Sequence, residues 1–447
     1  MPSLVQIMFV GGGSVQWGPR LITDLMLTTA LTGSRLMLYD LDHPATEQMA
    51  QLARRIAIET RSGWEVKVQD DLDRGLKGAD FVIFSIAQGG LETFRYDLEI
   101  PWRHGIAQPV GDTVGPGGIS RALYHIPVAL DIARRMEDLC PHAWFINLTN
   151  PLTVITHAVN RETRIRAIGL CHEMSSVVRC LANLFQVSPS AITVQIAGVN
   201  HLPWILRMHV DGRDGFSLLH QWLETHEPVY FVQDLPESSS VETVFRDRMA
   251  VKFTLFQLYG YLCGAGDRHV AEFFPAFLSA ESGYGRTYGV ELTTIEHRYE
   301  QLAQRRQVVT QMIKQPGPLE LRFSGEQLAR VVAALGAEQP GHFIVNIPNV
   351  GQVDNLSRDV VLECHAYLGP GGVEPISVGT LPTAVVQTLA GRVWQQEIIV
   401  DAAVRGDPAL VLQALLADPM VPSWEMALSL RDELLSAHVA YLPQFSQ

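Results

Sequence analysis

The chain has 447 residues, of which 47% are hydrophobic and 18% are charged, so it can bury a large core in two or three folding units. Its formal net charge is −13 and no run of lysine or arginine stands out, which argues against a nucleic-acid partner. No apolar stretch can span a bilayer, the N-terminus does not resemble a signal peptide, and the 5 cysteines are typical of reduced thiols. We therefore expect a cytoplasmic protein with no membrane partner.

The first motif is a glycine-rich turn between a strand and a helix. Residues 10–18 read Val-Gly-Gly-Gly-Ser-Val-Gln-Trp-Gly; they follow the apolar run 4–9 and precede the amphipathic stretch 19–31. Gly11 permits a tight turn, and Gly13 lets the backbone approach a pyrophosphate, which a helix N-terminus binds through its free N–H groups. This order predicts a dinucleotide site more strongly than an ordinary βα turn.

A second strand supports the dinucleotide interpretation. Arg35–Tyr39 ends in Asp40, an acidic residue placed to bond a ribose hydroxyl and so to favour NAD over NADP. Gln16 replaces the third glycine of the usual fingerprint, so the prediction depends on both strands together.

Up to about residue 200, short apolar runs alternate with helical periodicity. This alternation predicts an α/β fold, a Rossmann-like doubly wound parallel sheet over residues 1–200 that binds NAD. Residues 201–447 predict a second, α-rich α+β domain for substrate, metal and oligomer contacts. The predicted strands are 64–68, 81–86, 143–148, 167–170 and 193–197; the predicted helices are 45–59, 119–139, 151–160, 241–262, 293–314, 324–335, 380–400, 408–417 and 424–437; the predicted loops are 346–355 and 369–372.

Reactive residue types follow several predicted strands. Segments 147–151, 171–173 and 198–201 read Asn-Leu-Thr-Asn-Pro, Cys-His-Glu and Gly-Val-Asn-His. Open α/β sheets bind ligands beyond the carboxyl ends of their strands. Cys171 and His201 from neighbouring strand ends could hold one divalent metal with positions left for substrate oxygens. A single Cys or His is more often a structural residue than a ligand. The placement of both at strand ends nevertheless favours a metal site.

Two further segments carry more glycine and polar residues than a turn needs. Residues 110–118 precede a predicted helix, and residues 264–269, Gly-Ala-Gly-Asp-Arg-His, are expected to end a long one. A purely structural interpretation is that the first segment is a loop and the second is a helix cap. A functional interpretation is that they bring Asp112 and Asp267 to the sugar side of a nicotinamide.

The ordered motifs resemble glycoside hydrolase family 4, the NAD-dependent glycosidases, from Ile7 to the C-terminal helices. The resemblance implies a Rossmann domain related to lactate and malate dehydrogenases, NAD, a divalent metal (usually Mn²⁺) and a homodimer or homotetramer. It also implies roles for individual residues. These are metal ligation by Cys171 and His201, cofactor binding by Gly11, Gly13, Ser14, Gln16, Asp40 and Asn147, and contact with sugar hydroxyls by Asn150.

The resemblance further implies a mechanism in which NAD takes hydride from C3 of the sugar and so makes the C2 proton acidic. A base then removes that proton, the aglycone leaves C1, water adds, and the hydride returns. We expect Asp267 to be the base, with Asp112 or His172 assisting the leaving group.

The sequence Cys-His-Glu at 171–173 is similar to the branch of the family that acts on α-linked uronic acids, α-galacturonides and α-glucuronides. The substrate residues expected from this branch are Asn150, Glu173, Arg95, Arg268 and His269, with Arg103 and Arg121 as further anion contacts. Alternatives are a sulfonated sugar, as in NAD-dependent sulfoquinovosidases, and a neutral α-glucoside or α-galactoside. Other function classes are a hydroxy-acid or sugar dehydrogenase, which would accumulate NADH, and a silent NAD sensor.

Overall fold

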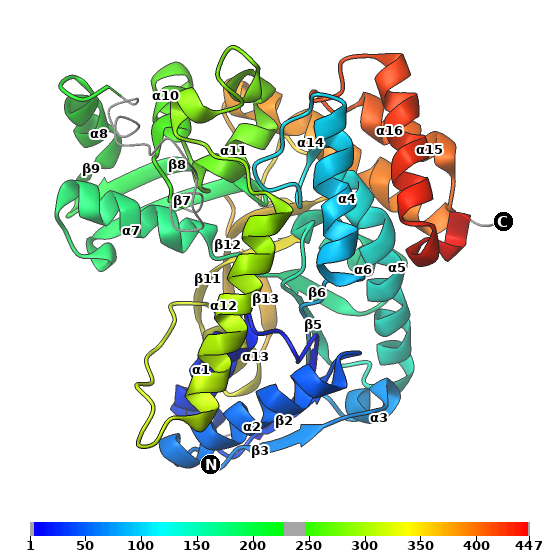
Figure 1. Cartoon of the computed structure of the whole chain (residues 1–447). Coiled ribbons are helices and arrows are strands. Elements are labelled where there is room, and N and C mark those ends of the chain that lie inside the picture. The colour runs from blue at the N-terminus through cyan, green and yellow to red at the C-terminus, as the bar shows by residue number, and fades with distance from the viewer. Residues whose placement is uncertain (1–3, 228–245, 446–447) are drawn as a thin grey trace.

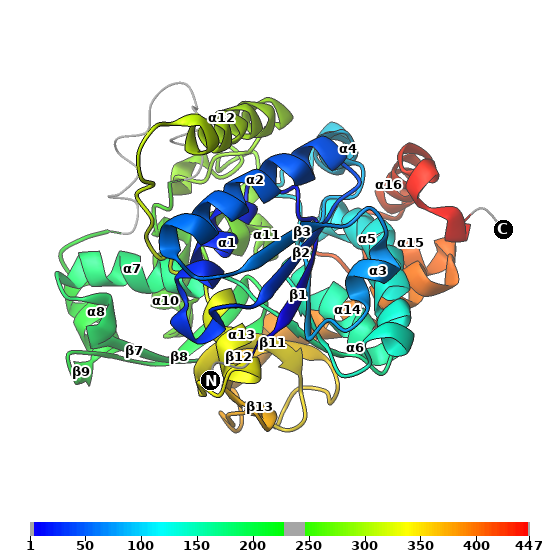
Figure 2. The ribbon, with the colours of Figure 1, turned by 90° about the horizontal axis from the view of Figure 1, so that it is seen from below.

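The computed structural model describes residues 4–227 and 246–445, and one large sheet runs through them (Figures 1 and 2). Six parallel strands lie in the order β3-β2-β1-β4-β5-β6, which is the strand order of a Rossmann fold. The predicted Rossmann-like parallel sheet is therefore confirmed for these six strands, whereas the predicted strand 193–197 pairs antiparallel with its neighbours. The bounds of the six parallel strands are β1 Gln6–Val10, β2 Arg35–Tyr39, β3 Glu65–Val68, β4 Phe81–Phe84, β5 Trp144–Asn147 and β6 Arg166–Gly169.

Beyond β6 the same sheet continues with antiparallel strands in the order β11-β12-β7-β8-β10. Residue 200, the predicted domain boundary, falls in the hairpin loop between β7 and β8, and that boundary stays a prediction. The bounds are β7 Ile192–Val199, β8 Leu202–Val210, β9 Arg213–Asp214, β10 Leu262–Cys263, β11 Gly341–Pro348, β12 Val361–Gly369 and β13 Gly372–Pro375.

Alternation along β1 explains how both faces of the sheet become buried. Ile7 and Phe9 pack on one face against α1, α2 and α13, whereas Met8 and Val10 pack on the other against α5 and α6. The helices of the parallel half are α1 Gly18–Leu27, α2 His43–Thr60, α3 Leu72–Leu76, α4 Gly90–Arg103, α5 Gly115–Leu139, α6 Leu152–Glu162 and α7 Glu173–Phe185.

Of the remaining helices, α8 and α10 pack on the antiparallel extension, whereas α12, α13, α14 and α16 pack on helices of the parallel half (Figure 1). Along α12, Gln48 of α2 contacts Thr310 and Glu92 of α4 contacts Tyr299, so this helix bridges α2 and α4. None of the described helices is long and apolar enough to cross a membrane. The bounds are α8 Gly215–Leu223, α10 Ala250–Tyr259, α11 Asp267–Phe273, α12 Ile295–Lys314, α13 Leu328–Gly336, α14 Thr383–Arg405, α15 Pro408–Leu416 and α16 Trp424–Ala437.

Three predicted segments differ from the structure. Residues 264–269 do not end a long helix, because β10 intervenes and Asp267 begins α11. The predicted helix 241–262 is described as α10 only from Ala250, and its first five residues lie outside the described part of the chain. The predicted loop 346–355 begins inside β11, whose last residues pair with β12.

Candidate active site

The carboxyl ends of two parallel strands and the β7–β8 loop line one cavity. Cys171 and His172 follow β6, Asn150 follows β5, and His201 lies in the hairpin loop. Trp17, the residue before α1, lines the same cavity and contacts the His172 ring edge-on, with 5.2 Å between centroids. The structure thus brings the predicted metal ligands Cys171 and His201 to one cavity with the predicted sugar contact Asn150.

His201 has an unusual backbone conformation. It is the second residue of the two-residue β7–β8 loop and has a φ of +65°, a region that non-glycine residues rarely occupy. Asn200 anchors this loop, because its N–H donates to Thr153 Oγ1 at 3.1 Å and its Nδ2 donates to Glu363 Oε2 at 3.0 Å. Burial raises the pKa of Glu363 to about 7. The loop holds His201 in place at a cost in local strain, which is common at functional sites.

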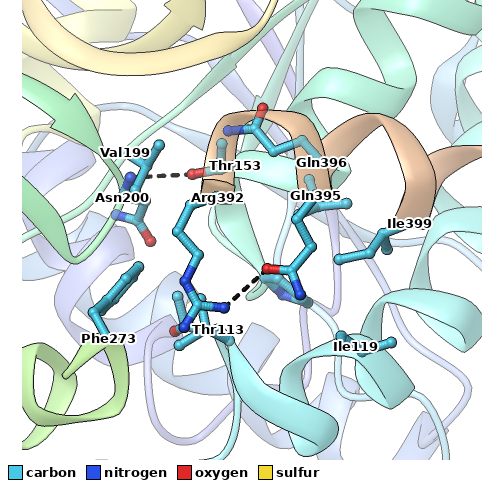
Figure 3. Close-up of a pocket in the computed structure, with 13 residues that line it drawn as sticks. Thr113, Ile119, Thr153, Val199, Asn200, Phe273, Arg392, Gln395, Gln396 and Ile399 are labelled. Atoms are coloured by element: carbon cyan, nitrogen blue, oxygen red, sulfur yellow. Dashed lines mark hydrogen bonds between the residues drawn. The ribbon is translucent and has the colours of Figure 1, made fainter. Parts of the chain in front are cut away.

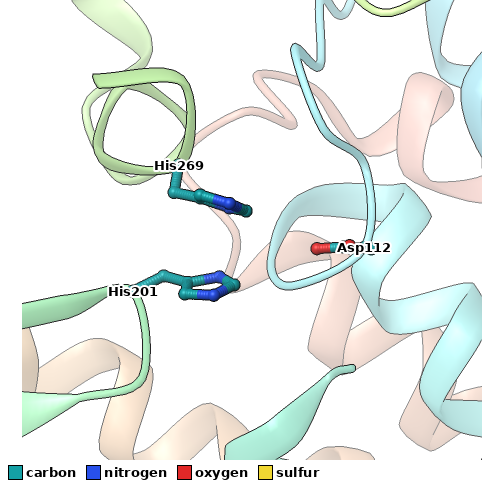
Figure 4. A group of neighbouring side chains, drawn as sticks. All are labelled: Asp112, His201 and His269. Carbon is teal, nitrogen blue, oxygen red and sulfur yellow. The ribbon is translucent and has the colours of Figure 1, made fainter. Parts of the chain in front are cut away.

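A carboxylate and two imidazoles from three segments converge beside the cavity (Figure 4). Asp112 lies in the loop before α5, and His269 lies in the first turn of α11. One donor atom from each of Asp112, His201 and His269 lies within 4.8 Å of the others. The two rings lie with centroids 3.7 Å apart, and both extend toward Asp112. Cys171 is not in this group, but it lines the same cavity as His201.

Burial sets the charges in this cluster. It lowers the pKa of His201 to about 3 and that of His269 to about 4, so both imidazoles are neutral at pH 7. Burial also opposes ionisation of Asp112, but His269, His201, Arg121 and a Thr113 hydrogen bond together hold the pKa of Asp112 well below its ordinary value. Because both imidazoles are uncharged at pH 7, the groups that stabilise the ionised form of Asp112 at that pH are Arg121 and Thr113. Neutral imidazoles and an ionised carboxylate are the forms that bind divalent cations.

Glu173 links the other predicted site residues. Its Oε2 accepts the N–H of Gly266 at 2.7 Å, which ties the start of α7 to the segment before α11. Its Oε1 lies 3.4 Å from His172 Nε2 and 3.9 Å from His269 Nε2. The predicted residues His172, Glu173 and His269 are therefore neighbours.

Asp267 caps the start of α10. Its Oδ2 accepts the N–H of Val251 at 3.0 Å and its Oδ1 accepts the N–H of Lys252 at 3.1 Å. The fully buried Lys252 Nζ lies 3.1 Å from Oδ1 and also pairs with Asp247. Burial raises the pKa of Asp267, and Lys252 opposes that rise. These contacts engage both oxygens of the expected base, whose role stays a prediction.

The β1–α1 turn has the shape that a dinucleotide site requires. Gly11 has a φ of +86°, and a Cβ at this position would lie 1.9 Å from the carbonyl oxygen of Ser85. The N–H of Gly13 donates to Asp40 Oδ2 at 3.1 Å, which ties the turn to the end of β2. The structure therefore brings Gly11, Gly13 and Asp40 together as predicted from their spacing.

The remaining predicted cofactor residues have different surroundings. Ser14 Oγ accepts the N–H of Trp17 at 3.3 Å, and Gln16 is exposed on the turn. Asn147 is fully buried, and its side-chain amide forms hydrogen bonds with Thr149, Leu152 and Thr156. Asn147 thus shapes the end of β5.

Two of the expected anion-binding arginines lie away from the cavity. Arg95 is on the outer side of α4, where its guanidinium lies 3.6 Å from Glu92 Oε2 and 3.5 Å from Glu99 Oε1. Arg103 is exposed and pairs with Glu433 at 2.7 Å. Both side chains form surface ion pairs, which are typically weak.

Three other arginines gather around Asp112. The guanidinium carbons of Arg121 and Arg298 lie 4.8 and 5.3 Å from the centroid of the Phe94 ring. Arg268, in the first turn of α11, donates to the carbonyl of Pro109 at 2.6 Å. Burial, with Arg298 nearby, lowers the pKa of Arg268 to about 9, because the positive charges crowd one another. Sequence reasoning missed Arg298, since nothing along α12 marks which of its arginines points inward.

Glu272 is a second residue that sequence reasoning missed. It is fully buried on α11, and its Oε1 accepts the N–H groups of Val110 and Gly111 at 2.7 and 2.8 Å. Burial raises the pKa of Glu272 to about 8, so it carries a proton at pH 7. Glu272 follows His269 by three residues, so a helical reading of 267–273 would have placed both on one face.

A second cavity lies behind the β7–β8 loop (Figure 3). Asn200 and Thr113 line it, together with Arg392 of α14, whose Nη1 donates to Gln395 Oε1 at 2.9 Å and pairs with Asp418. Asp418 also accepts the N–H of Gly115 at 3.0 Å, so these buried polar contacts hold the end of the loop that carries Asp112.

Comparison with known proteins identifies the class of protein that this fold and site define. Residues 6–187 match the family described as "Family 4 glycosyl hydrolase", and residues 196–421 match "Family 4 glycosyl hydrolase C-terminal domain". The chain therefore belongs to the family 4 glycosyl hydrolases, and it is a glycoside hydrolase. The expected family is confirmed.

Individual members of the family are similar to this chain over most of its length. An "Alpha-galacturonidase" of Thermoanaerobacter italicus is 34% identical over 429 residues, covering 93% of this chain and 92% of that protein. A solved structure from Bacillus subtilis is 32% identical with a TM-score of 0.88, covering 97% and 100% of the two chains. The 6-phospho-beta glucosidase of Thermotoga maritima, solved with manganese, NAD+ and glucose-6-phosphate, has a TM-score of 0.79 at 22% identity, covering 97% and 98%. At that identity it supports the fold alone.

Proposed function

We propose that this protein hydrolyses an α-linked anionic sugar, an α-galacturonide or α-glucuronide, with NAD and a divalent cation bound. The observation that best supports an anionic substrate is the group of three arginines around Asp112. Arg121, Arg268 and Arg298 each lie near enough to Asp112 to feel its charge, and the neighbouring Glu272 carries a proton at pH 7. Such a group of guanidinium side chains could bind a carboxylate at C6 of the sugar bidentately. The name of the relative from Thermoanaerobacter italicus agrees with this substrate class.

The residues present fit both groups that the family uses. The collision that a Cβ at Gly11 would cause marks a turn shaped for close backbone approach, and α1 begins directly after the turn. Asp40 keeps a lone pair on each oxygen for ribose hydroxyls, since each oxygen accepts one backbone N–H. Cys171 and His201 line one cavity and are ordinary ligands of divalent transition-metal ions. Burial raises the pKa of Cys171 well above its usual range, so the thiol needs a cation beside it to ionise.

When bound beside the β1–α1 turn, NAD would supply a reversible hydride acceptor for the sugar, and a cation held by Cys171 and His201 would supply a Lewis acid. The chain must provide a base for the C2 proton and an acid for the leaving oxygen. We expect Asp267 to take the first role, because burial raises the pKa of its carboxyl. His172, which lines the cavity and is partly exposed, can protonate the leaving group.

A panel of aryl α-glycosides tests the substrate class. We expect the galacturonide to be hydrolysed with a higher kcat/KM than the neutral galactoside, the 6-phosphorylated or the sulfonated analogue. Losing a buried charge-assisted contact costs about 2–5 kcal/mol, at least about 30-fold in kcat/KM. Arg298→Met should therefore lower kcat/KM for the galacturonide and spare the galactoside.

Arg95→Ala is the matched control, because it removes an arginine that contacts Glu92, Glu99 and Tyr299 and does not line the cavity. We expect it to leave both activities close to those of the wild type. A wild type that prefers the neutral galactoside, or an equal loss on both substrates in Arg298→Met, would contradict the anionic assignment.

A further inference from the structure

Thr113 joins Asp112 to His201 through a single hydroxyl. Thr113 Oγ1 lies 2.7 Å from Asp112 Oδ1 and 2.8 Å from His201 Nδ1. Both distances are those of good hydrogen bonds. The hydroxyl has one proton, so it can donate to only one of these two partners.

The chemistry of the three groups decides the direction of both bonds. An ionised carboxylate can only accept, so the Thr113 hydroxyl donates to Asp112. The hydroxyl oxygen then accepts from His201, which requires the proton of that imidazole to be on Nδ1. The lone pair of His201 is consequently on Nε2. His201 lines the same cavity as Cys171, and an Nε2 lone pair is what a cation in that cavity needs.

The loop that carries Thr113 is held firmly enough to impose this arrangement. Glu272 binds the N–H groups of Val110 and Gly111 just ahead of it. On the other side the backbone of α5 presses close, since a Cβ at Gly118 would lie 2.5 Å from the carbonyl carbon of Thr113. Thr113 therefore cannot move away from His201 without disturbing its neighbours.

We propose that Thr113 is a positioning residue that fixes His201 as the Nδ1–H tautomer and so presents Nε2 to the divalent cation. In this arrangement Asp112 and Thr113 orient the ring of His201, and Cys171 Sγ and His201 Nε2 would be the ligands of the cation. The proposal rests on the proposed use of a cation, and its first test does not involve the cation.

The tautomer can be read directly from ¹⁵N-histidine NMR spectra of the cation-free, NAD-loaded protein, with His201→Gln to assign the signal. We expect His201 to be protonated at Nδ1 in the wild type and in Thr113→Ser, which keeps the hydroxyl. In Thr113→Val, which has nearly the same shape but no hydroxyl, the signal should shift toward the Nε2–H form or a mixture. An unchanged tautomer in Thr113→Val would overturn the proposal.

Mn²⁺ titration of the same three NAD-loaded proteins, followed by the EPR signal of free Mn²⁺, provides the second readout. Loss of a group that orients a metal-binding histidine typically costs about 10–100-fold in metal affinity. We expect that loss in Thr113→Val, recovery in Thr113→Ser, and unchanged NAD affinity in all three. Equal Mn²⁺ affinity in all three proteins, or equal loss in both variants, would overturn the proposal. If the wild type binds no Mn²⁺, the proposed cation fails, while the NMR result still decides the role of Thr113.

Discussion

Replacing Glu272 by glutamine should make the protein progressively more stable than the wild type as the pH rises. Glu272 is fully buried, and burial raises its pKa from 4.5 to about 8. Between these values the folded chain keeps a proton that the unfolded chain has released, so rising pH lowers the folding stability of the wild type. One such group accounts for about 1.4 kcal/mol per pH unit, or about 3 kcal/mol between pH 5 and pH 7.

Glu272→Gln keeps an oxygen for the N–H groups of Val110 and Gly111 but cannot titrate. Melting curves at pH 5, 6 and 7 should show its Tm rising relative to the wild type by about 3 °C across the range, since 1 kcal/mol shifts the Tm of a chain of this length by about 1 °C. Glu300→Gln, the same change at an exposed position of α12, is the control and should show a constant difference. A difference for Glu272→Gln that does not change with pH would refute the reasoning.

Three further changes test other parts of the structure. Lys252→Met leaves the carboxylates of Asp247 and Asp267 without their buried cation and should cost about 3–5 kcal/mol, seen as a large fall in Tm; an unchanged Tm would contradict the ion-pair reading. Gly11→Ala should abolish NAD binding in a fluorescence titration, because its Cβ would meet Ser85, whereas Gly78→Ala, which points into open space, should retain it; equal affinities would argue against the turn as the cofactor site. Burial lowers the pKa of His269 from 6.5 to about 4, so the wild type loses stability as the pH falls through that window, and His269→Gln should lose less of its Tm on acidification; parallel Tm curves would count against a neutral buried His269.

The parallel half of the fold could be predicted because its signals are local. Apolar runs bounded by turns correspond to β1 and β2, and strict helical periodicity corresponds to α16. β11 and β12 escaped prediction for a physical reason. The Asn-Ile-Pro-Asn sequence at the end of β11 has the composition of a loop, yet residues 346–348 pair with β12. Long-range pairing overrides local preference there.

In the candidate site, too, some residues could be predicted from local signals in the sequence and others could not. Cys171 and Asn150 could be placed together because each follows a parallel strand of one sheet, and the carboxyl ends of parallel strands meet at one edge. His201 lines the same cavity, although it follows β7, which belongs to the antiparallel extension. Arg298 and Glu272 could not be predicted, because the sequence does not show where α11 and α12 pack. Arg95 was expected to bind the substrate anion because of its position in the chain. It lies instead on a side of α4 where its guanidinium pairs with Glu92 and Glu99. Thr113 was missed because its role depends on two hydrogen bonds that exist only in the folded chain.

The most direct test of the proposed function is hydrolysis of an aryl α-galacturonide in D₂O by protein stripped of NAD and by the same protein with NAD restored, each with Mn²⁺ present. We predict no hydrolysis without NAD. With NAD restored, hydrolysis should resume with deuterium at C2 of the released sugar and no accumulation of NADH. Hydrolysis at an undiminished rate after NAD is removed would contradict the account.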